Sequence, residues 1–118
     1  MSEGVQRDPD LVGLVRDYFS QTFTPEVVAD VERDGPSPQL WHSIEELGLP
    51  LVGIDEGSGG SGGSLLDLLA VMEGAGRYAV ALPLAETSLA AWLLASAGAE
   101  VPAGPLSVVP VTGELTLA

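Results

Sequence analysis

The stretch DEGSGGSGGS, residues 55–64, decides whether this chain folds as one domain or two. Its composition is typical of the flexible spacers placed between two fused domains. A spacer joins parts that fold independently, but the residues up to Ile54 predict only three short helices, whose core is too small to stand alone. Ser64 and Asp67 also have the spacing of a capping box, so the next helix needs Ser64. We therefore favour a natural loop inside one domain over an engineered spacer.

Helix-start signals recur on both sides of this loop. Asp8, Thr24 and Ser37 each precede a proline, which is the pairing of N-cap residue and first-turn proline that begins helices. Apolar residues follow each pair at helical spacing. Five helices are predicted, with starts near Pro9, Pro25, Pro38, Leu65 and Leu84, and with Gly48 and Gly98 ending the third and the fifth. Residues 49–54 are predicted to form a short extended segment.

The pattern changes after Gly104, where apolar residues begin to alternate around the turn Thr112-Gly113. This alternation, over residues 106–117, predicts two short strands and a turn. Two strands alone are only marginally stable, so we read them as the start of something larger. We predict an all-α domain, residues 1–104, of about five helices in an orthogonal bundle. Residues 105–118 are predicted to be the beginning of a β domain that is cut off at Ala118.

Composition excludes several classes of function. The chain has 118 residues with 17 acidic and 4 basic side chains, a formal net charge of −13, which repels nucleic acids and anionic membrane surfaces. Cysteine is absent and His42 is the only histidine, so the sequence offers neither a disulfide framework nor a zinc site. The first ten residues are polar and acidic, unlike a signal or transit peptide, and we expect a cytoplasmic protein.

The fifth predicted helix is apolar around its whole circumference, because residues 89–95 read LAAWLLA. Such a helix must be covered on all sides. A membrane span is disfavoured, since Arg77, Pro83 and Glu86 interrupt the apolar run and no basic residues flank it. We expect the cover to come from the rest of a longer polypeptide or from a partner subunit.

Four segments, taken in order, resemble a known family. They are WHSIEELGL at residues 41–49, Asp55-Glu56 with the glycine pairs 59–60 and 62–63, the helix 65–77 ending in EGAGR, and PLAET at residues 83–87. Together they resemble the N-terminal helical domain of acyl-CoA dehydrogenases over roughly residues 38–118. No single segment is specific, and the resemblance rests on their order.

The resemblance implies an architecture of helical N-terminal domain, middle β domain and C-terminal four-helix bundle. It implies α,β-desaturation of an acyl-CoA thioester, in which a carboxylate takes the α-proton and FAD receives the β-hydride, in a homo- or hetero-oligomer. The family's catalytic glutamate and most of its flavin contacts lie later in the chain. We therefore predict no catalytic residue here, and a 118-residue chain that is inactive alone and does not retain FAD.

The resemblance also implies substrate-binding residues at the start of the fifth helix. There the family lines the far end of its acyl pocket, and side chains would select acyl groups by excluded volume. The matching positions are Leu82, Pro83, Ala85, Glu86 and Leu89.

One segment of the sequence departs from the family pattern at a motif that binds flavin. Typical members open the β domain near a Thr-Glu-Pro motif, where this chain has SVVPVTG at residues 107–113. Two alternatives to a flavin-binding parent therefore stay open: a non-flavin subunit of a heteromeric dehydrogenase, and a free-standing helical interaction module that oligomerises through the fifth helix.

Simpler interpretations apply to several conspicuous residues. Glu86 suits the first turn of a helix, where a carboxylate interacts favourably with the helix dipole. Glu73 and Arg77 have the spacing of an ordinary helical ion pair. His42 is predicted to be a surface residue, and Trp41 and Trp92 are predicted to be core or interface anchors.

Overall fold

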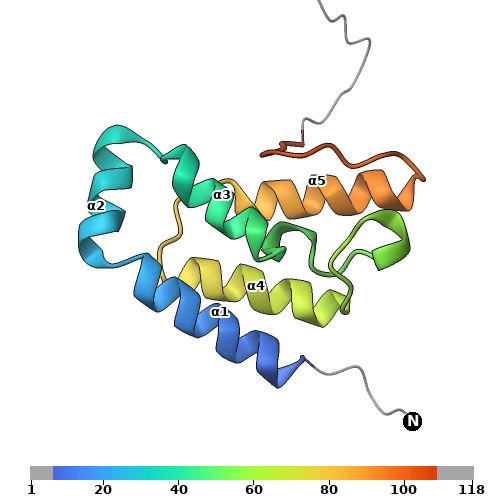
Figure 1. Cartoon of the computed structure of the whole chain (residues 1–118), viewed down its shortest axis with the longest axis horizontal. Helices are drawn as coiled ribbons and strands as arrows, with labels where there is room; N and C mark the ends of the chain where they lie inside the picture. Colours follow the sequence, from blue (N-terminus) through green and yellow to red (C-terminus); the bar gives the residue numbers. More distant parts are fainter. Residues whose placement is uncertain (1–6, 109–118) are drawn as a thin grey trace, which may run out of the picture.

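Three of the five α-helices begin with an N-cap residue followed by a proline, as the sequence predicts. The side chains of Asp8, Thr24 and Ser37 accept hydrogen bonds from backbone N–H groups in the first turn, and each is followed by proline. The computed structural model describes residues 7–108. Its helices, in chain order, are α1 (Pro9–Thr22), α2 (Pro25–Asp34), α3 (Pro38–Glu46), the 3-10 helices η1 (Leu49–Leu51) and η2 (Glu56–Ser58), α4 (Leu65–Arg77) and α5 (Leu84–Ser96). The predicted all-α class is confirmed for the described residues (Figure 1).

The predicted capping box at the start of α4 is present and has a further partner. Ser64 Oγ accepts from the backbone N–H of Asp67 (3.2 Å), and Asp67 Oδ2 accepts from the N–H of Ser64 (2.9 Å). Asp67 Oδ1 also accepts from the N–H of Asp8 (2.7 Å), the N-cap of α1. One carboxylate therefore joins the starts of two helices, through Asp8 and Asp67, which are 59 positions apart in the sequence.

α1 and α4 lie side by side along their lengths (Figure 1). Their close approach depends on Gly74, since a Cβ atom there would lie 2.4 Å from Cγ1 of Val15. The core draws its buried side chains from α1, α3, η1, α4 and the start of α5, and the valines of α2 pack at its edge. Its largest fully buried apolar side chains are Phe19, Ile44, Leu49, Val71 and Leu84.

The glycine-rich loop is folded onto the helices and is not a free spacer. The N–H of Gly53 donates to the carbonyl of Gly62 (2.9 Å), and the N–H of Gly62 donates to the carbonyl of Ile54 (2.8 Å). At Gly60 a Cβ atom would stand 2.1 Å from the Ile54 carbonyl oxygen, so only glycine fits. These contacts support the interpretation of residues 55–64 as an integral loop.

The segment before this loop differs from its prediction. Residues 49–54 were expected to be extended, but the first three form η1 and only Val52 makes an isolated bridge, to Gly62. The reason lies at Gly48, whose left-handed backbone (φ 72°) ends α3 and whose carbonyl accepts from the N–H of Leu51 (3.2 Å). That bond closes a tight turn in place of a strand.

The chain after α5 turns back and runs along this helix (Figure 1). We call residues 97–108 the return segment. Thr87 Oγ1 accepts from the N–H of Leu106 (2.9 Å) and donates to its carbonyl (3.3 Å), while Glu45 Oε2 accepts from the N–H of Gly104 (2.9 Å). Residues 106–108 make no strand pairing, and the remainder of the predicted strands lies outside the described residues. The β beginning therefore stays a prediction.

One predicted ion pair is wrong. Glu73 does not pair with Arg77, because its carboxylate lies 3.1 Å from the guanidinium of Arg7. The guanidinium of Arg77 instead lies over the ring of Tyr78, 5.8 Å from its centroid. Between residues 7 and 108, no helix combines the length and the apolar character that a bilayer crossing requires.

Candidate functional site

Helix α5 has one covered and one uncovered face. Thr87, Ser88 and Ala91 are buried, and the hydroxyl of Ser88 donates to the carbonyl of Pro50 (3.0 Å), which fixes α5 against η1. The residues three and four positions apart on the other side face outward. We call this set the outer stripe of α5; it comprises Ala85, Glu86, Leu89, Trp92 and Leu93.

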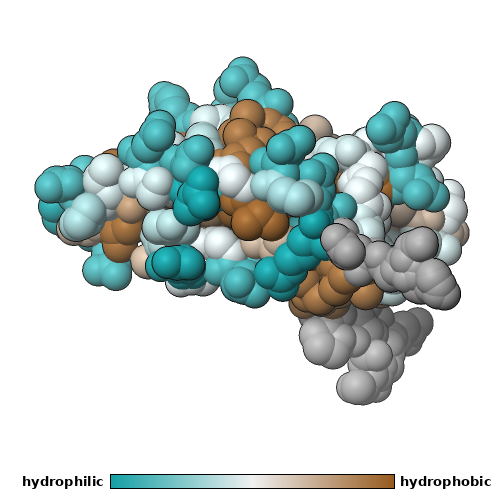
Figure 2. All heavy atoms as spheres, turned by 90° about the horizontal axis from the view of Figure 1, so that it is seen from below, coloured by the Kyte–Doolittle hydropathy of each residue, from teal (hydrophilic) through white to brown (hydrophobic). Residues whose placement is uncertain are grey.

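Large apolar side chains of the outer stripe remain accessible. Leu89 is 45%, Trp92 41% and Leu93 44% exposed. Three neighbouring large apolar residues on one helix face are an unusual surface for an isolated soluble domain. The expectation that residues 7–108 alone cannot cover α5 is therefore supported. Other apolar side chains also reach the surface, and Figure 2 shows such patches among hydrophilic atoms on the face seen from below.

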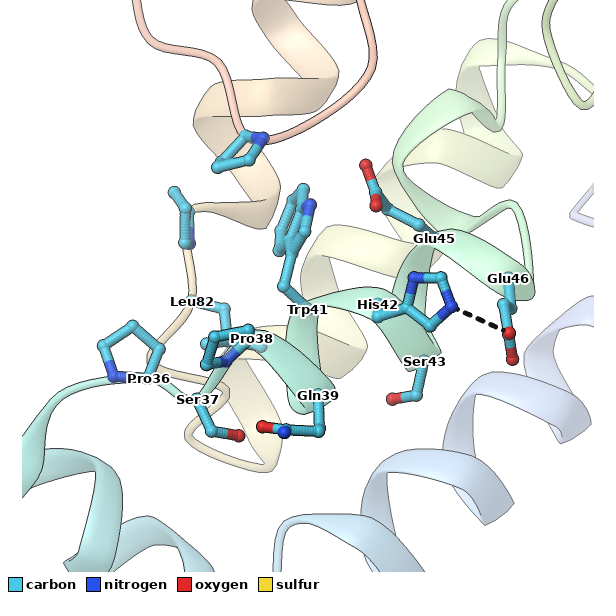
Figure 3. A pocket seen from close by; sticks show the side chains of 12 residues that line it. Pro36, Ser37, Pro38, Gln39, Trp41, His42, Ser43, Glu45, Glu46 and Leu82 are labelled. Atoms are coloured by element: carbon cyan, nitrogen blue, oxygen red, sulfur yellow. Dashed lines mark ion pairs between the residues drawn. The ribbon is translucent and has the colours of Figure 1, made fainter.

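A pocket lies elsewhere, between α3 and the residues that lead into α5. Its volume of about 710 Å³ is in the range of small-molecule sites. Figure 3 shows Trp41 at its centre, with Leu82 and Pro38 on one side and His42, Glu45 and Glu46 of α3 on the other. The lining residues are Pro36, Ser37, Pro38, Gln39, Trp41, His42, Ser43, Glu45, Glu46, Leu82, Pro83 and Pro105.

The polar groups of this pocket are mostly committed to structural contacts. His42 Nε2 lies 3.0 Å from the carboxylate of Glu46, and both side chains are exposed, as predicted for His42. The hydroxyl of Ser43 donates to the carbonyl of Leu40 (2.9 Å) and also contacts the hydroxyl of Tyr18. The hydroxyl of Ser43 is therefore bonded to Leu40 and Tyr18, and the imidazole of His42 contacts Glu46.

Trp41 is a core anchor, as predicted. Its side chain is only 9% exposed, and its indole Nε1 is buried without a hydrogen-bond partner within the described part of the chain. A buried donor that lacks a partner destabilises a fold by about 1–3 kcal/mol. Trp92, by contrast, lies on the outer stripe beside the loop residues Asp55 and Ser58.

Local hydrogen bonds shift the pKa values of Asp67 and Arg33. The backbone N–H groups of Asp8 and then Ser64 hold the pKa of the Asp67 carboxyl below its usual value. Hydrogen bonds to Asp34 and Asp30 raise the pKa of the exposed Arg33 guanidinium. Arg33 lies in the last turn of α2 and Asp67 in the first turn of α4, and neither lines the pocket or belongs to the outer stripe.

The structure divides the five predicted substrate-binding residues between two places. Leu82 and Pro83 line the pocket beside Trp41. Ala85, Glu86 and Leu89 lie on the outer stripe of α5, where Glu86 occupies the first turn of the helix as predicted. Trp92 and Leu93 belong to the same stripe but were not predicted as site residues, although their spacing of three and four from Leu89 was the available signal.

The glycine-rich loop does not fit the pyrophosphate of a flavin nucleotide. A phosphate-binding loop needs free backbone N–H groups, but those of Gly53, Gly60 and Gly62 all donate to carbonyls of this same region. The side chains beside them, Asp55 and Glu56, are acidic and exposed. Within residues 7–108 there is also no cluster of three or more side chains that could hold a metal ion.

Comparison with known proteins identifies the domain. The family model described as acyl-CoA dehydrogenase, N-terminal domain, matches residues 8–101, which include all five α-helices. No match was found among curated proteins or among solved structures. The match covers most of the 118 residues, and the order of motifs along the chain agrees with it. This chain belongs to the acyl-CoA dehydrogenase N-terminal domain family.

Proposed function

We propose that the chain is the substrate-pocket domain of a flavin-dependent acyl-CoA dehydrogenase that introduces an α,β double bond into an acyl-CoA thioester. Family membership supports this reaction class. The observation that carries the proposal is the uncovered outer stripe of α5, which includes three of the residues expected at the far end of the acyl pocket. An acyl chain and a second protein surface would together cover this stripe.

The chain's own contribution is to shape the pocket. Ala85 and Leu89 present apolar atoms one helical turn apart and would limit acyl length or branching by excluded volume. The acid–base and redox steps would fall to residues and a cofactor outside the described part of the chain, since the family's catalytic glutamate and most of its flavin contacts lie outside its N-terminal domain. Alone, the 118-residue chain is catalytically silent and colourless.

The test uses the flavin-containing assembly purified through a tag on this chain. Substitution Ala85→Leu narrows the expected pocket, and it should lower kcat/KM for the longest accepted acyl-CoA by about tenfold while short acyl-CoA substrates are unaffected. Ala29→Leu is the matched control, because Ala29 is exposed on α2. An unchanged acyl-length preference, or tight flavin binding by the isolated chain, would contradict the proposal.

Two alternatives draw on particular observations. The departure from the Thr-Glu-Pro motif at residues 107–113 favours a non-flavin subunit that shapes the pocket of a partner. The uncovered stripe also favours a helical interaction module, which would form a flavin-free oligomer of this chain. Absorbance spectra and sedimentation of the purified assembly distinguish the three outcomes.

A further inference from the structure

The charges around the outer stripe of α5 are of one sign. Glu86 is in the first turn of α5, three positions before Leu89. Asp55 shares a small surface pocket with Trp92 at the other end of the stripe, and Glu56 is exposed beside it. An apolar centre is thus bordered by carboxylates at both ends.

The basic side chains of the chain contact residues other than Glu86 and Asp55. The sequence has four arginines and no lysine. Three of the arginines pair with acidic side chains of the chain itself, Arg7 with Glu73, Arg16 with Asp17, and Arg33 with Asp30 and Asp34. The fourth, Arg77, lies in the last turn of α4 over the ring of Tyr78. No arginine lies on α5, so Glu86 has no basic side chain on its own helix.

From this charge pattern we propose that the outer stripe of α5 docks a protein surface with an apolar centre and a rim of lysine or arginine side chains. The apolar centre would cover Leu89, Trp92 and Leu93, while the basic rim would meet Glu86 and Asp55. Complementary rims of this kind speed association and exclude wrong partners. The inference builds on the proposed function by stating the chemistry of the surface that covers α5.

A second copy of this chain fits the stripe poorly. A two-fold contact through α5 places the same patch on both sides. It would bring Glu86 and Asp55 of one copy toward acidic residues of the other. The net charge of −13 on each copy adds a long-range repulsion. The charges therefore select a different, basic-rimmed partner.

The test uses two synthetic amphipathic peptides of about 18 residues with the same leucine face. One peptide carries lysine and the other glutamate along the flanks of that face. Each is labelled with a dye, and its binding to the full 118-residue chain is followed by fluorescence anisotropy. At low salt the lysine peptide should bind at least about tenfold more tightly than the glutamate peptide, and the ratio should approach one at about 1 M salt.

Two matched variants test whether the carboxylate on α5, and not the total charge of the chain, gives the lysine peptide its higher affinity. Glu86→Gln and Asp17→Asn each remove one exposed carboxylate, from α5 and from α1 respectively. Only Glu86→Gln should reduce the lysine peptide's advantage, by about threefold. Leu89→Ser should weaken both peptides, and a lysine peptide with scrambled sequence should bind no better than the glutamate peptide.

Three results would overturn the inference. They are equal affinity for the two peptides, an equal effect of Asp17→Asn and Glu86→Gln, and a low-salt dimer of the chain that Leu89→Ser disrupts. The last result would assign the stripe to a second copy. None of these measurements involves flavin or acyl-CoA, so they succeed or fail independently of the acyl-length test of the proposed function.

Discussion

The carboxylate of Asp67 offers a sharp test of how the domain is held together. It accepts two backbone hydrogen bonds, from Asp8 (2.7 Å) and Ser64 (2.9 Å), and it is only 7% exposed. Substitution Asp67→Ala removes both bonds and leaves two N–H groups without their acceptor. A hydrogen bond to a charged group contributes about 1.5 kcal/mol or more. The variant should therefore lose about 3 kcal/mol of unfolding free energy, a decrease in Tm of roughly 15 °C for a domain of this size.

Two companion variants define the origin of this loss. Asp67→Asn keeps one acceptor oxygen but turns an amide N–H₂ toward the second backbone donor, so it should lose about half as much. Asp10→Ala is the matched control, because Asp10 is an exposed acid in the first turn of α1 and contributes only a few tenths of a kcal/mol through the helix dipole. Thermal unfolding followed by circular dichroism at 222 nm gives all three values at about pH 7.

The pH dependence of the stability difference between the native chain and Asp67→Ala tests whether the charged carboxylate is responsible. The folded pKa of Asp67 is lowered, so its stabilisation is fully present above the unfolded pKa of about 3.9 and is lost as the pH falls through the folded value. The difference between the native chain and Asp67→Ala should therefore be constant from about pH 5 to 8 and shrink below about pH 4. The reasoning is refuted if Asp67→Ala costs no more than Asp10→Ala, or if the difference persists unchanged in acid.

Three further predictions concern close approaches in the fold. Gly74→Ala should destabilise the domain by about 2 kcal/mol, because its Cβ would lie 2.4 Å from an α1 side chain. Gly76→Ala on the same helix meets open space and should stabilise the domain by about 0.5–1 kcal/mol. Urea unfolding measures both changes. Gly60→Ala should cost about 3 kcal/mol by collision with a backbone carbonyl, and Gly57→Ala, which meets nothing, should change the urea midpoint little. Thr87→Val removes the two hydrogen bonds between this side chain and Leu106, and it should speed cleavage of the return segment by a non-specific protease severalfold, with a Tm change of only a few degrees. Faster cleavage together with a large loss of Tm would show that the segment and the helices unfold together.

Much of the architecture is local and was therefore predictable. The N-caps at Asp8, Thr24 and Ser37 and the box of Ser64 and Asp67 act within four residues, so their spacing alone places the helix starts. The ordered motifs were also sufficient to predict the family, because they are properties of the sequence itself. The all-round apolar character of the fifth helix predicted that it needs cover, for the same reason.

Other features depend on which distant residues meet, and only the tertiary structure decided them. Glu73 pairs with Arg7 and not with its helical neighbour, because α1 packs along α4 and brings a distant guanidinium within 3.1 Å. The predicted substrate residues divide between a pocket and a stripe, because α5 starts at Leu84 and its rotation turns Ala85 and Leu89 away from Trp41. Sequence spacing defines the faces of a helix, but the neighbours that cover one face and leave the other open are set by packing across the whole chain.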